Sequence, residues 1–203
     1  VRHKIIKTEE LNDKKFISNP SNRCYFCKKG LFSKLKALAK RYNLKVVLDA
    51  SNVSDNKDYR PGNRAKRELG ILSPLKEAGF NKEEISALSR RLGLNTWNKP
   101  NLACLASRVP YGIRITPRLL TRINKAEELL RSMGLRQARF RHYPDGLCRI
   151  EVHEESMGLL VRHRKSIIDR LRGMGYNYIT MDLEGYRTGS LNLVLPAKNK
   201  KGV

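Results

Sequence analysis

An amphipathic segment followed directly by a short apolar run constrains the fold of this chain more than any other feature. One face of a helix is predicted by the spacing of three and four residues between Leu31, Leu35, Leu38 and Tyr42. Residues 44–49 (LKVVLD) then read as a buried strand, and a polar loop follows at residues 50–63. Helix, buried strand and polar loop in this order are typical of a parallel α/β sheet, whose ligands lie beyond the carboxyl ends of the strands.

The first half of the chain ends with one more predicted helix, and the pattern changes beyond residue 110. A capping box at Asn81 and Glu84 starts a helix whose buried stripe is predicted to be Ile85, Leu88 and Leu92, and an aperiodic stretch follows it. The next pattern predicts a strand, a helix that begins at Thr116 and Pro117, a hairpin, a second helix and a last strand, at residues 111–115, 116–134, 137–153, 157–171 and 176–183. This order predicts an α+β, ferredoxin-like domain of the split βαβ type.

Charge and composition limit the class of protein. The 42 Lys and Arg residues against 19 Asp and Glu residues give a net charge of +23, which favours polyanionic partners such as tRNA, nucleotides or phosphorylated substrates. A generally basic proteome or a more acidic segment elsewhere in the protein explains the charge equally well. No apolar run approaches the roughly 18 residues of a membrane span, and the first 30 residues lack a secretory pattern, so we expect a cytoplasmic protein with no membrane partner.

The four cysteines are too few for a disulfide scaffold, so their spacing carries the interpretation. Cys24 and Cys27 form a C-x-x-C, which fits a redox pair, half of a zinc site, two buried small residues or a metal centre. Cys104 lies in an aperiodic loop (ACLASR), whereas Cys148 alternates with apolar residues and is expected to be buried. Three cysteine thiolates can ligate an iron–sulfur cluster and leave one iron without a protein ligand, whereas a structural zinc site usually needs four ligands.

Two arginines in the predicted hairpin offer an anion site. Arg139 and Arg141 are two residues apart, so they share one face of a strand and can form a fork for a phosphate or carboxylate. The alternative is a solvated polar face on a basic protein. Arg149 and Glu151 are expected to lie opposite them on the second strand.

Several long blocks, in the same order, resemble the LarE family of PP-loop sulfur transferases. The blocks are NPSNRCYFCKKGLF, DYRPGNRAKRELGILSPLKEAGFNKEEI, WNKPNLACLASR, PYGIRIT and DLEGYRTGSLN. The resemblance implies an α/β fold in two parts: an incomplete Rossmann-like PP-loop ATP pyrophosphatase domain at residues 1–106 and the ferredoxin-like C-terminal domain at residues 107–203. It also implies an ATP-dependent enzyme that adenylylates a carboxylate and replaces the activated oxygen with sulfur.

The resemblance assigns roles to particular residues. It places substrate phosphate at Ser107, Arg108, Arg139 and Arg141, sulfur transfer at Cys104, and a 4Fe-4S cluster on Cys24, Cys27 and Cys104. The implied substrate is a pyridinium mononucleotide, the precursor of a nickel-pincer cofactor, and the implied assembly is a homo-oligomer. In other members a single cysteine in the ACLASR loop is a sacrificial sulfur donor.

The chain departs from the family pattern at its nucleotide site. The glycine-rich SGGxDS phosphate loop is absent, so ATP and magnesium are expected only in a complete protein that carries this segment. In the remaining loop, Asp49, Asn52 and Asp55 match the family's nucleotide contacts, while Ser54 replaces an expected acid. A tRNA-thiolating PP-loop enzyme and a basic RNA-binding protein with a degenerate PP-loop fold are the alternatives, and a steep salt dependence of tRNA binding distinguishes both from the first hypothesis.

Overall fold

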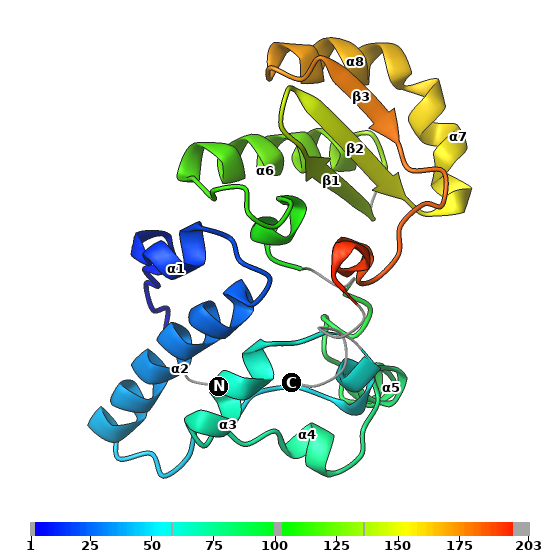
Figure 1. Ribbon diagram of the computed structural model, residues 1–203. Helices are drawn as coiled ribbons and strands as arrows, with labels where there is room; N and C mark the ends of the chain where they lie inside the picture. Colours follow the sequence, from blue (N-terminus) through cyan, green and yellow to red (C-terminus); the bar gives the residue numbers. More distant parts are fainter. Residues whose placement is uncertain (1–2, 58, 100–102, 136, 197–203) are drawn as a thin grey trace. The chain divides into compact units, whose positions relative to one another are not determined.

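The chain forms two compact units, each with its own secondary structure. The computed structural model describes residues 3–57, 59–99, 103–135 and 137–196. Unit 1 comprises Val1–Asn101 with Leu195–Val203, and unit 2 comprises Leu102–Val194. The helices and the three-stranded sheet make this a mixed α/β protein (Figure 1). Of the helices in the described ranges, none has the length and apolar character that a membrane crossing requires.

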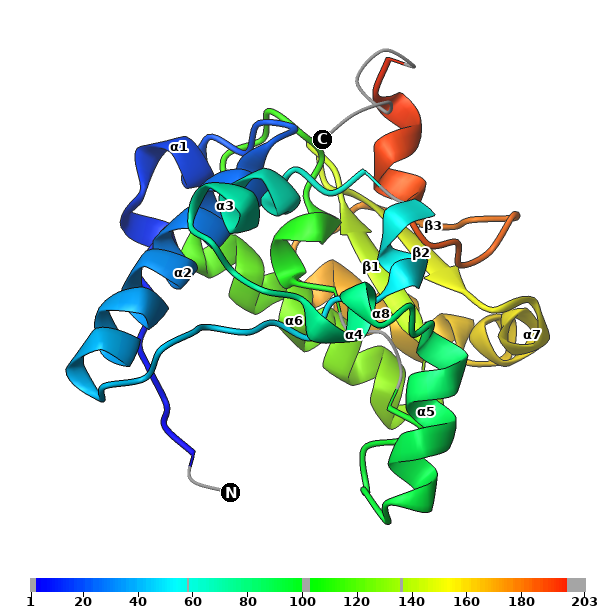
Figure 2. The same ribbon diagram turned by 90° about the horizontal axis from the view of Figure 1, so that it is seen from below.

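Unit 1 is built from short helices around one long helix. The long helix is α2 (Arg23–Arg41), and the predicted helix at residues 31–42 is confirmed within it apart from its last residue. α3 (Gly62–Glu68) lies beside α2 in both views (Figures 1 and 2), and Phe32, Ala39 and Ala65 are buried. The remaining elements are η1 (Glu10–Asn12), α1 (Lys14–Ile17), η2 (Val53–Lys57), α4 (Pro74–Glu77) and α5 (Lys82–Arg91).

The prediction of a buried strand at residues 44–49 is wrong. Leu44, Val46 and Leu48 are 61%, 55% and 54% exposed, and the backbone of this segment pairs with the described residues only at a parallel bridge between Leu48 and Leu72. The capping box at Asn81 and Glu84 is confirmed at the start of α5. The stripe on α5 is nevertheless not buried, since Leu92 is 74% exposed. Regularly spaced apolar side chains are buried only when another surface packs against them, and the described residues of unit 1 do not supply such a surface here.

Unit 2 is a three-stranded sheet packed against helices. Its elements are η3 (Leu105–Arg108), α6 (Pro117–Ser132), β1 (Ala138–His142), β2 (Leu147–Val152), α7 (Glu154–Arg162), α8 (Arg164–Gly173), β3 (Tyr178–Met181) and η4 (Ser190–Val194). The Thr116 hydroxyl accepts from the backbone N–H of Leu119, with Pro117 at the first helical position, as predicted. The predicted hairpin is confirmed as antiparallel β1 and β2. The second predicted helix divides at His163 into α7 and α8.

The apolar core of unit 2 lies between one face of the sheet and the helices. Phe140 and Ile150 on the strands pack with Ile123 and Leu130 of α6 and with Leu171 of α8, and all five side chains are buried. Tyr176 meets the Phe140 ring edge-on at 4.9 Å between centroids. Alternate residues of β1 and β2 therefore point away from this core, onto the opposite face of the sheet.

The predicted first strand at residues 111–115 is wrong, and the ferredoxin-like arrangement is not confirmed. The backbone N–H of Ile113 bonds back to the carbonyl of Pro110, and Gly112 has a φ of +83°, so this segment turns where a strand would extend. β3 pairs in parallel directly with β2, whereas a ferredoxin-like sheet would place its first strand between these two. Ile115 is still buried, which explains the apolar pattern of the segment.

Candidate functional site

The face of the sheet opposite the apolar core carries a network of charged side chains. In the hairpin register Arg139 lies across from Glu151, and Arg141 lies across from Arg149. Arg139, Arg141 and Glu151 are each less than 9% exposed. Buried charges must be paired to be tolerated, so the contacts of this network determine what it can do.

Arg141 is the centre of this network. Its Nε and Nη2 donate to the two carboxylate oxygens of Glu151 at 2.8 and 2.9 Å, while Nη1 donates to the Ser107 carbonyl and Nη2 also donates to Ser190 Oγ, both at 2.6 Å. Burial alone would raise the pKa of Glu151, but hydrogen bonds and charges from Arg141 and Arg149 outweigh it and lower that pKa. Arg141 therefore joins the sheet to η3 and to η4.

Arg108, the last residue of η3, links η3 to α6. Its Nε and Nη2 donate to the two oxygens of the buried Glu127 on α6 at 2.7 and 3.1 Å. Glu127 Oε1 also accepts from the backbone N–H of Phe140 at 3.1 Å. A bidentate arginine–carboxylate pair is rigid as well as strong, so η3 is fixed to both α6 and β1.

Cys104 is displayed at the start of this anchored loop. It is exposed and immediately precedes η3, and its carbonyl accepts from Ser107 Oγ at 2.8 Å and from Arg108 Nη1 at 3.2 Å. Arg139 lies with its guanidinium 5.0 Å from the Tyr186 ring centroid, and burial together with the charge of Arg108 lowers its pKa. Ser107, Arg108 and Arg141 are thus brought together around the Cys104 loop, as direct contacts show.

Cys24 and Cys27 lie in unit 1, at the beginning of α2. Both thiols are partly exposed, and their spacing of three residues places them about one helical turn apart. Two basic neighbours of these cysteines have other contacts: Arg23 is buried against Asn19, and Lys29 reaches Tyr25 and Glu68. In the described ranges no three His, Cys, Asp or Glu side chains form a group that could hold a metal ion.

Cys148 and His142 are buried, as predicted for Cys148. Burial raises the pKa of the Cys148 thiol to about 12, so this sulfur is inert. Burial and the nearby charge of Arg122 lower the pKa of His142 to about 4. At neutral pH the Cys148 thiol is therefore protonated and unreactive, and His142 is a neutral, buried imidazole whose Nδ1 lies 3.2 Å from the Tyr176 hydroxyl.

The three residues predicted to contact nucleotide, Asp49, Asn52 and Asp55, make hydrogen bonds to other residues of unit 1. Asp49 accepts from Ser51 and Ser73 at 2.7 and 2.6 Å and pairs with the buried Lys66 at 2.9 Å. Burial by itself raises the pKa of Asp49, but these partners outweigh it and hold the pKa at about 2. The Asn52 side chain caps the N–H of Ser54, and Asp55 accepts from the N–H of Asn52.

Sequence reasoning gave several members of the charged network no ion-pairing role. Two adjacent acids on a helix, Glu127 and Glu128, are expected to be exposed, but Glu127 is buried. It falls in the apolar stripe formed by Ile123, Ala126 and Leu130, a position where a carboxylate needs a buried cation, and that signal could have predicted its pairing. Ser190 and Tyr186 belong to the DLEGYRTGSLN block, to which no role was assigned. Gly185 in this block has a φ of +70°, and a Cβ there would lie 2.8 Å from the Val152 carbonyl oxygen, so glycine is required at this turn.

Fold and site together define a mixed α/β protein that displays an exposed cysteine on a loop fixed by two buried arginine–glutamate pairs. No protein-family model matches the chain. It is 40% identical over 197 residues to an uncharacterized protein of Synechocystis sp., covering 96% of this chain and 73% of the relative. It is 36% identical over 182 residues to pyridinium-3,5-bisthiocarboxylic acid mononucleotide synthase of Lactiplantibacillus plantarum, covering 90% and 66%.

A third relative comes from an archaeon. An uncharacterized protein of Methanocaldococcus jannaschii is 32% identical over 185 residues, covering 91% of this chain and 70% of the relative. The chain belongs to the LarE family, as its order of sequence blocks predicted. It spans about two thirds to three quarters of the length of these relatives.

Proposed function

We propose that the protein to which this chain belongs is an ATP-dependent sulfur transferase of nickel-pincer cofactor biosynthesis, acting on the carboxylate of a pyridinium mononucleotide. The observation that carries the proposal is the exposed Cys104 on a loop that Arg108 and Arg141 fix to the sheet. The relative from L. plantarum, whose name contains the thiocarboxylated product, supports the substrate class. Such an enzyme needs a sulfur atom held at a defined place beside an anionic substrate.

The reaction has two steps whose atoms balance. A substrate carboxylate oxygen attacks the α-phosphorus of ATP and releases pyrophosphate, which gives an acyl adenylate. A sulfur nucleophile then attacks the acyl carbon, and AMP leaves with the original oxygen. If Cys104 supplies the sulfur, its Cβ–Sγ bond breaks after acyl transfer with loss of the α-proton, and dehydroalanine remains.

The nucleotide step belongs to unit 1 in this proposal, as the remainder of a Rossmann-like PP-loop domain. Asp49, Asn52 and Asp55 are the proposed contacts of ATP and its magnesium ion. Asp49 stays ionised at neutral pH, which supports a role near a cation. Its bonds to Ser51 and Lys66 give it a positioning function for the loop in addition.

Ser107, Arg108, Arg139 and Arg141 are the proposed phosphate-facing residues around Cys104. Their contacts with Glu127 and Glu151 mean that a phosphate must share Arg108 and Arg141 with carboxylates that already hold them. Both arginines therefore also position the Cys104 loop.

A 4Fe-4S cluster is the proposed source of exchangeable sulfur, with Cys24, Cys27 and Cys104 as the residues that would hold it. The accessibility of the donors supports this choice, since these three thiols are exposed or partly exposed while the fourth, Cys148, is buried. When bound, such a cluster with three protein ligands offers an open iron corner for an additional sulfide. In this case Cys104 stays intact as a ligand.

The test is the mass of the peptide that contains Cys104 after turnover. We expect the complete protein, with its ATP-binding segment and activated substrate, to turn over with added sulfide while Cys104 keeps its mass. Stoichiometric dehydroalanine without sulfide-dependent turnover would instead establish a sacrificial cysteine. Cys148→Ala is the matched control, expected to retain activity; an active Cys104→Ala variant would remove sulfur transfer at this loop from the proposal.

A further inference from the structure

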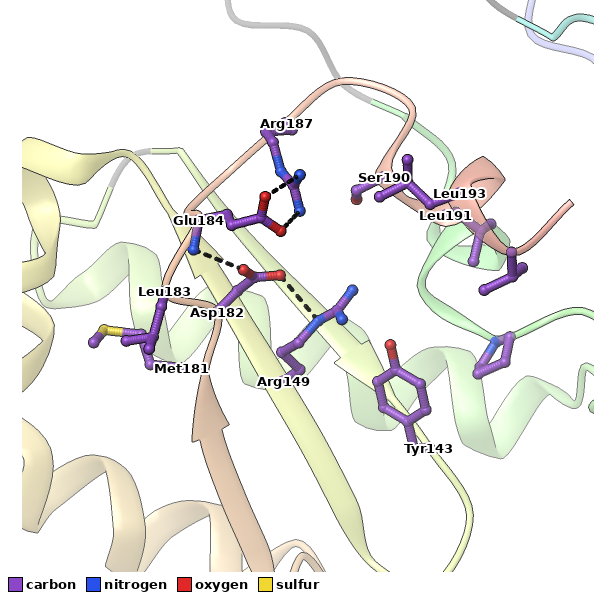
Figure 3. Close-up of a pocket in the computed structure, with 12 residues that line it drawn as sticks. Tyr143, Arg149, Met181, Asp182, Leu183, Glu184, Arg187, Ser190, Leu191 and Leu193 are labelled. Atoms are coloured by element: carbon purple, nitrogen blue, oxygen red, sulfur yellow. Dashed lines mark hydrogen bonds and ion pairs between the residues drawn. The ribbon is translucent and has the colours of Figure 1, made fainter. Parts of the chain in front are cut away.

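A pocket of about 410 Å³ lies in unit 2 on the outer side of the charged face of the sheet. Its walls come from β2, from the end of β3 and from the DLEGYRTGSLN block, whose role the sulfur-transfer proposal leaves open. We call it the Arg187 pocket. Figure 3 shows the Arg149 guanidinium and the Tyr143 hydroxyl pointing into the space that Arg187, Ser190 and Leu191 border. A volume of this size accommodates a small organic ligand.

The two arginines of this pocket are held less tightly than those of the buried network. Arg187 pairs with Glu184, at 2.8 Å between Nη1 and Oε1, but their side chains are 37% and 70% exposed. An exposed pair of this kind contributes little free energy, so an incoming anion can replace Glu184 at small cost. Arg108 and Arg141, by contrast, are buried and bound in bidentate fashion to glutamates.

Arg149 offers a second cationic group on the opposite wall. It pairs with Asp182 at 3.3 Å through Nε and with Glu151 at 3.0 Å through Nη2, and it is about one third exposed. The Nε atom of Arg187 is buried and makes no hydrogen bond to any described residue, while the buried Nε atom of Arg149 has the ion pair with Asp182 but no well-formed hydrogen bond to a described residue. Two guanidinium groups whose donors are incompletely satisfied at one pocket favour a ligand that carries acceptor oxygens.

Apart from Tyr143 and Ser190, the rest of the lining is apolar. Leu183, Leu193 and Val194 are 82%, 59% and 76% exposed, and Leu191 and Met181 lie beside them. Inorganic phosphate would leave these side chains in water, whereas an organic anion would cover them with its body. Ser190 borders the pocket and also bonds Arg141, which in turn holds the Ser107 carbonyl, so the pocket is connected to the Cys104 loop by direct contacts within unit 2.

We propose that the Arg187 pocket binds a small organic anion, with a carboxylate on Arg187 and Arg149 and its apolar body against Leu191 and Leu193. The choice of a pyridinium mononucleotide as this anion rests on the proposed function; the site itself rests on the pocket. Arg187 then acts as a specificity residue outside the buried network, and the DLEGYRTGSLN block acquires a role in ligand binding.

The experiment is calorimetric titration of the 203-residue chain with nicotinic acid mononucleotide and, separately, with inorganic phosphate. We expect Arg187→Met to raise the dissociation constant of the mononucleotide tenfold or more, because a charge-assisted bond to an anion is lost. Leu193→Asp should weaken binding by a similar factor, since it places a carboxylate on the apolar wall. Arg172→Met, on the exposed side of α8, is the matched control and should bind like the parent chain.

Three results would overturn the inference. They are unchanged affinity in Arg187→Met, inorganic phosphate binding as tightly as the mononucleotide, and absence of mononucleotide binding to the parent chain at millimolar concentration. The sulfur-transfer proposal fails separately, through turnover by Cys104→Ala in the complete protein. Arg187-dependent binding combined with such turnover would leave the pocket established and the role of Cys104 rejected.

Discussion

Runs of alternating apolar residues differ in burial between the two units. In unit 2 the alternating residues of β1 and β2 are buried, with Phe140 and Ile150 at 0 and 2% exposure. Unit 1 leaves Leu44, Val46 and Leu48 more than half exposed, although their spacing is as regular as that of any strand in unit 2. The difference teaches that a hydrophobic pattern specifies which face of an element can be buried, while burial itself requires a surface to pack against.

The largest expected effect tests this contrast directly. Phe140→Ala should lower the free energy of unfolding of unit 2 by about 3 to 5 kcal/mol, because it removes a fully buried ring and leaves a cavity. The matched change in unit 1, Val46→Ala, should cost less than about 0.5 kcal/mol, since that side chain is largely in solvent. Urea titration followed through the amide signals of each unit separates the two. A large loss for Val46→Ala would show that its surface is covered in solution.

A somewhat smaller effect is expected at the charged face of unit 2. Glu127→Gln should destabilise this unit by roughly 3 kcal/mol, because it leaves Arg108 buried without its counter-ion. The neighbouring Glu128 is exposed and, among the residues that the structure describes, bonds only Asn124 of its own helix, so Glu128→Gln serves as the control. Release of the loop should also speed alkylation of Cys104, which mass spectrometry can follow. Equal stability of the two variants would contradict the anchoring role of the Arg108–Glu127 pair.

The remaining predicted effects concern pH, and the stability of each unit is expected to fall in a different pH range. The pKa of His142 is lowered to about 4 in the fold, so the unfolded chain binds more protons below its ordinary value of 6.5. Unit 2 should therefore lose about 3 kcal/mol as the pH falls from 6.5 to 4. For Asp49 the pKa falls from 3.8 to about 2, so its contribution, about 2 kcal/mol, persists to lower pH and is lost between 4 and 2.

The measurement for this prediction is the stability of each unit as a function of pH. His142→Phe keeps an aromatic ring beside Tyr176 and should remove the loss in unit 2 between pH 6.5 and 4. Asp49→Asn should remove only the loss of stability of unit 1 between pH 4 and 2. If unit 1 loses stability at a higher pH than unit 2 as the pH falls, the assignment of the two pH ranges is incorrect.

Much of unit 2 was predictable because its signals are local. The cap at Thr116, the first-turn Pro117 and the turn at Asp145 and Gly146, with φ values of +58° and +72°, each determine the backbone over a few residues. The family was likewise evident from ordered blocks such as WNKPNLACLASR. The roles of Cys24, Cys27 and Cys104 as sulfur or cluster ligands remain predictions.

The sequence by itself determined the alternation in the hairpin, the starts of α5 and α6 and the burial of Cys148, because these depend on steric and capping preferences and on a period of two or 3.6 residues. Only the tertiary structure decided that Arg108 and Arg141 pair with Glu127 and Glu151, which lie 19 and 10 residues away. It also decided that residues 111–115 turn and that residues 44–49 stay exposed. Charge pairing and burial depend on which surfaces come into contact in the tertiary structure. Neither hydrophobic periodicity nor secondary-structure propensity specifies these contacts.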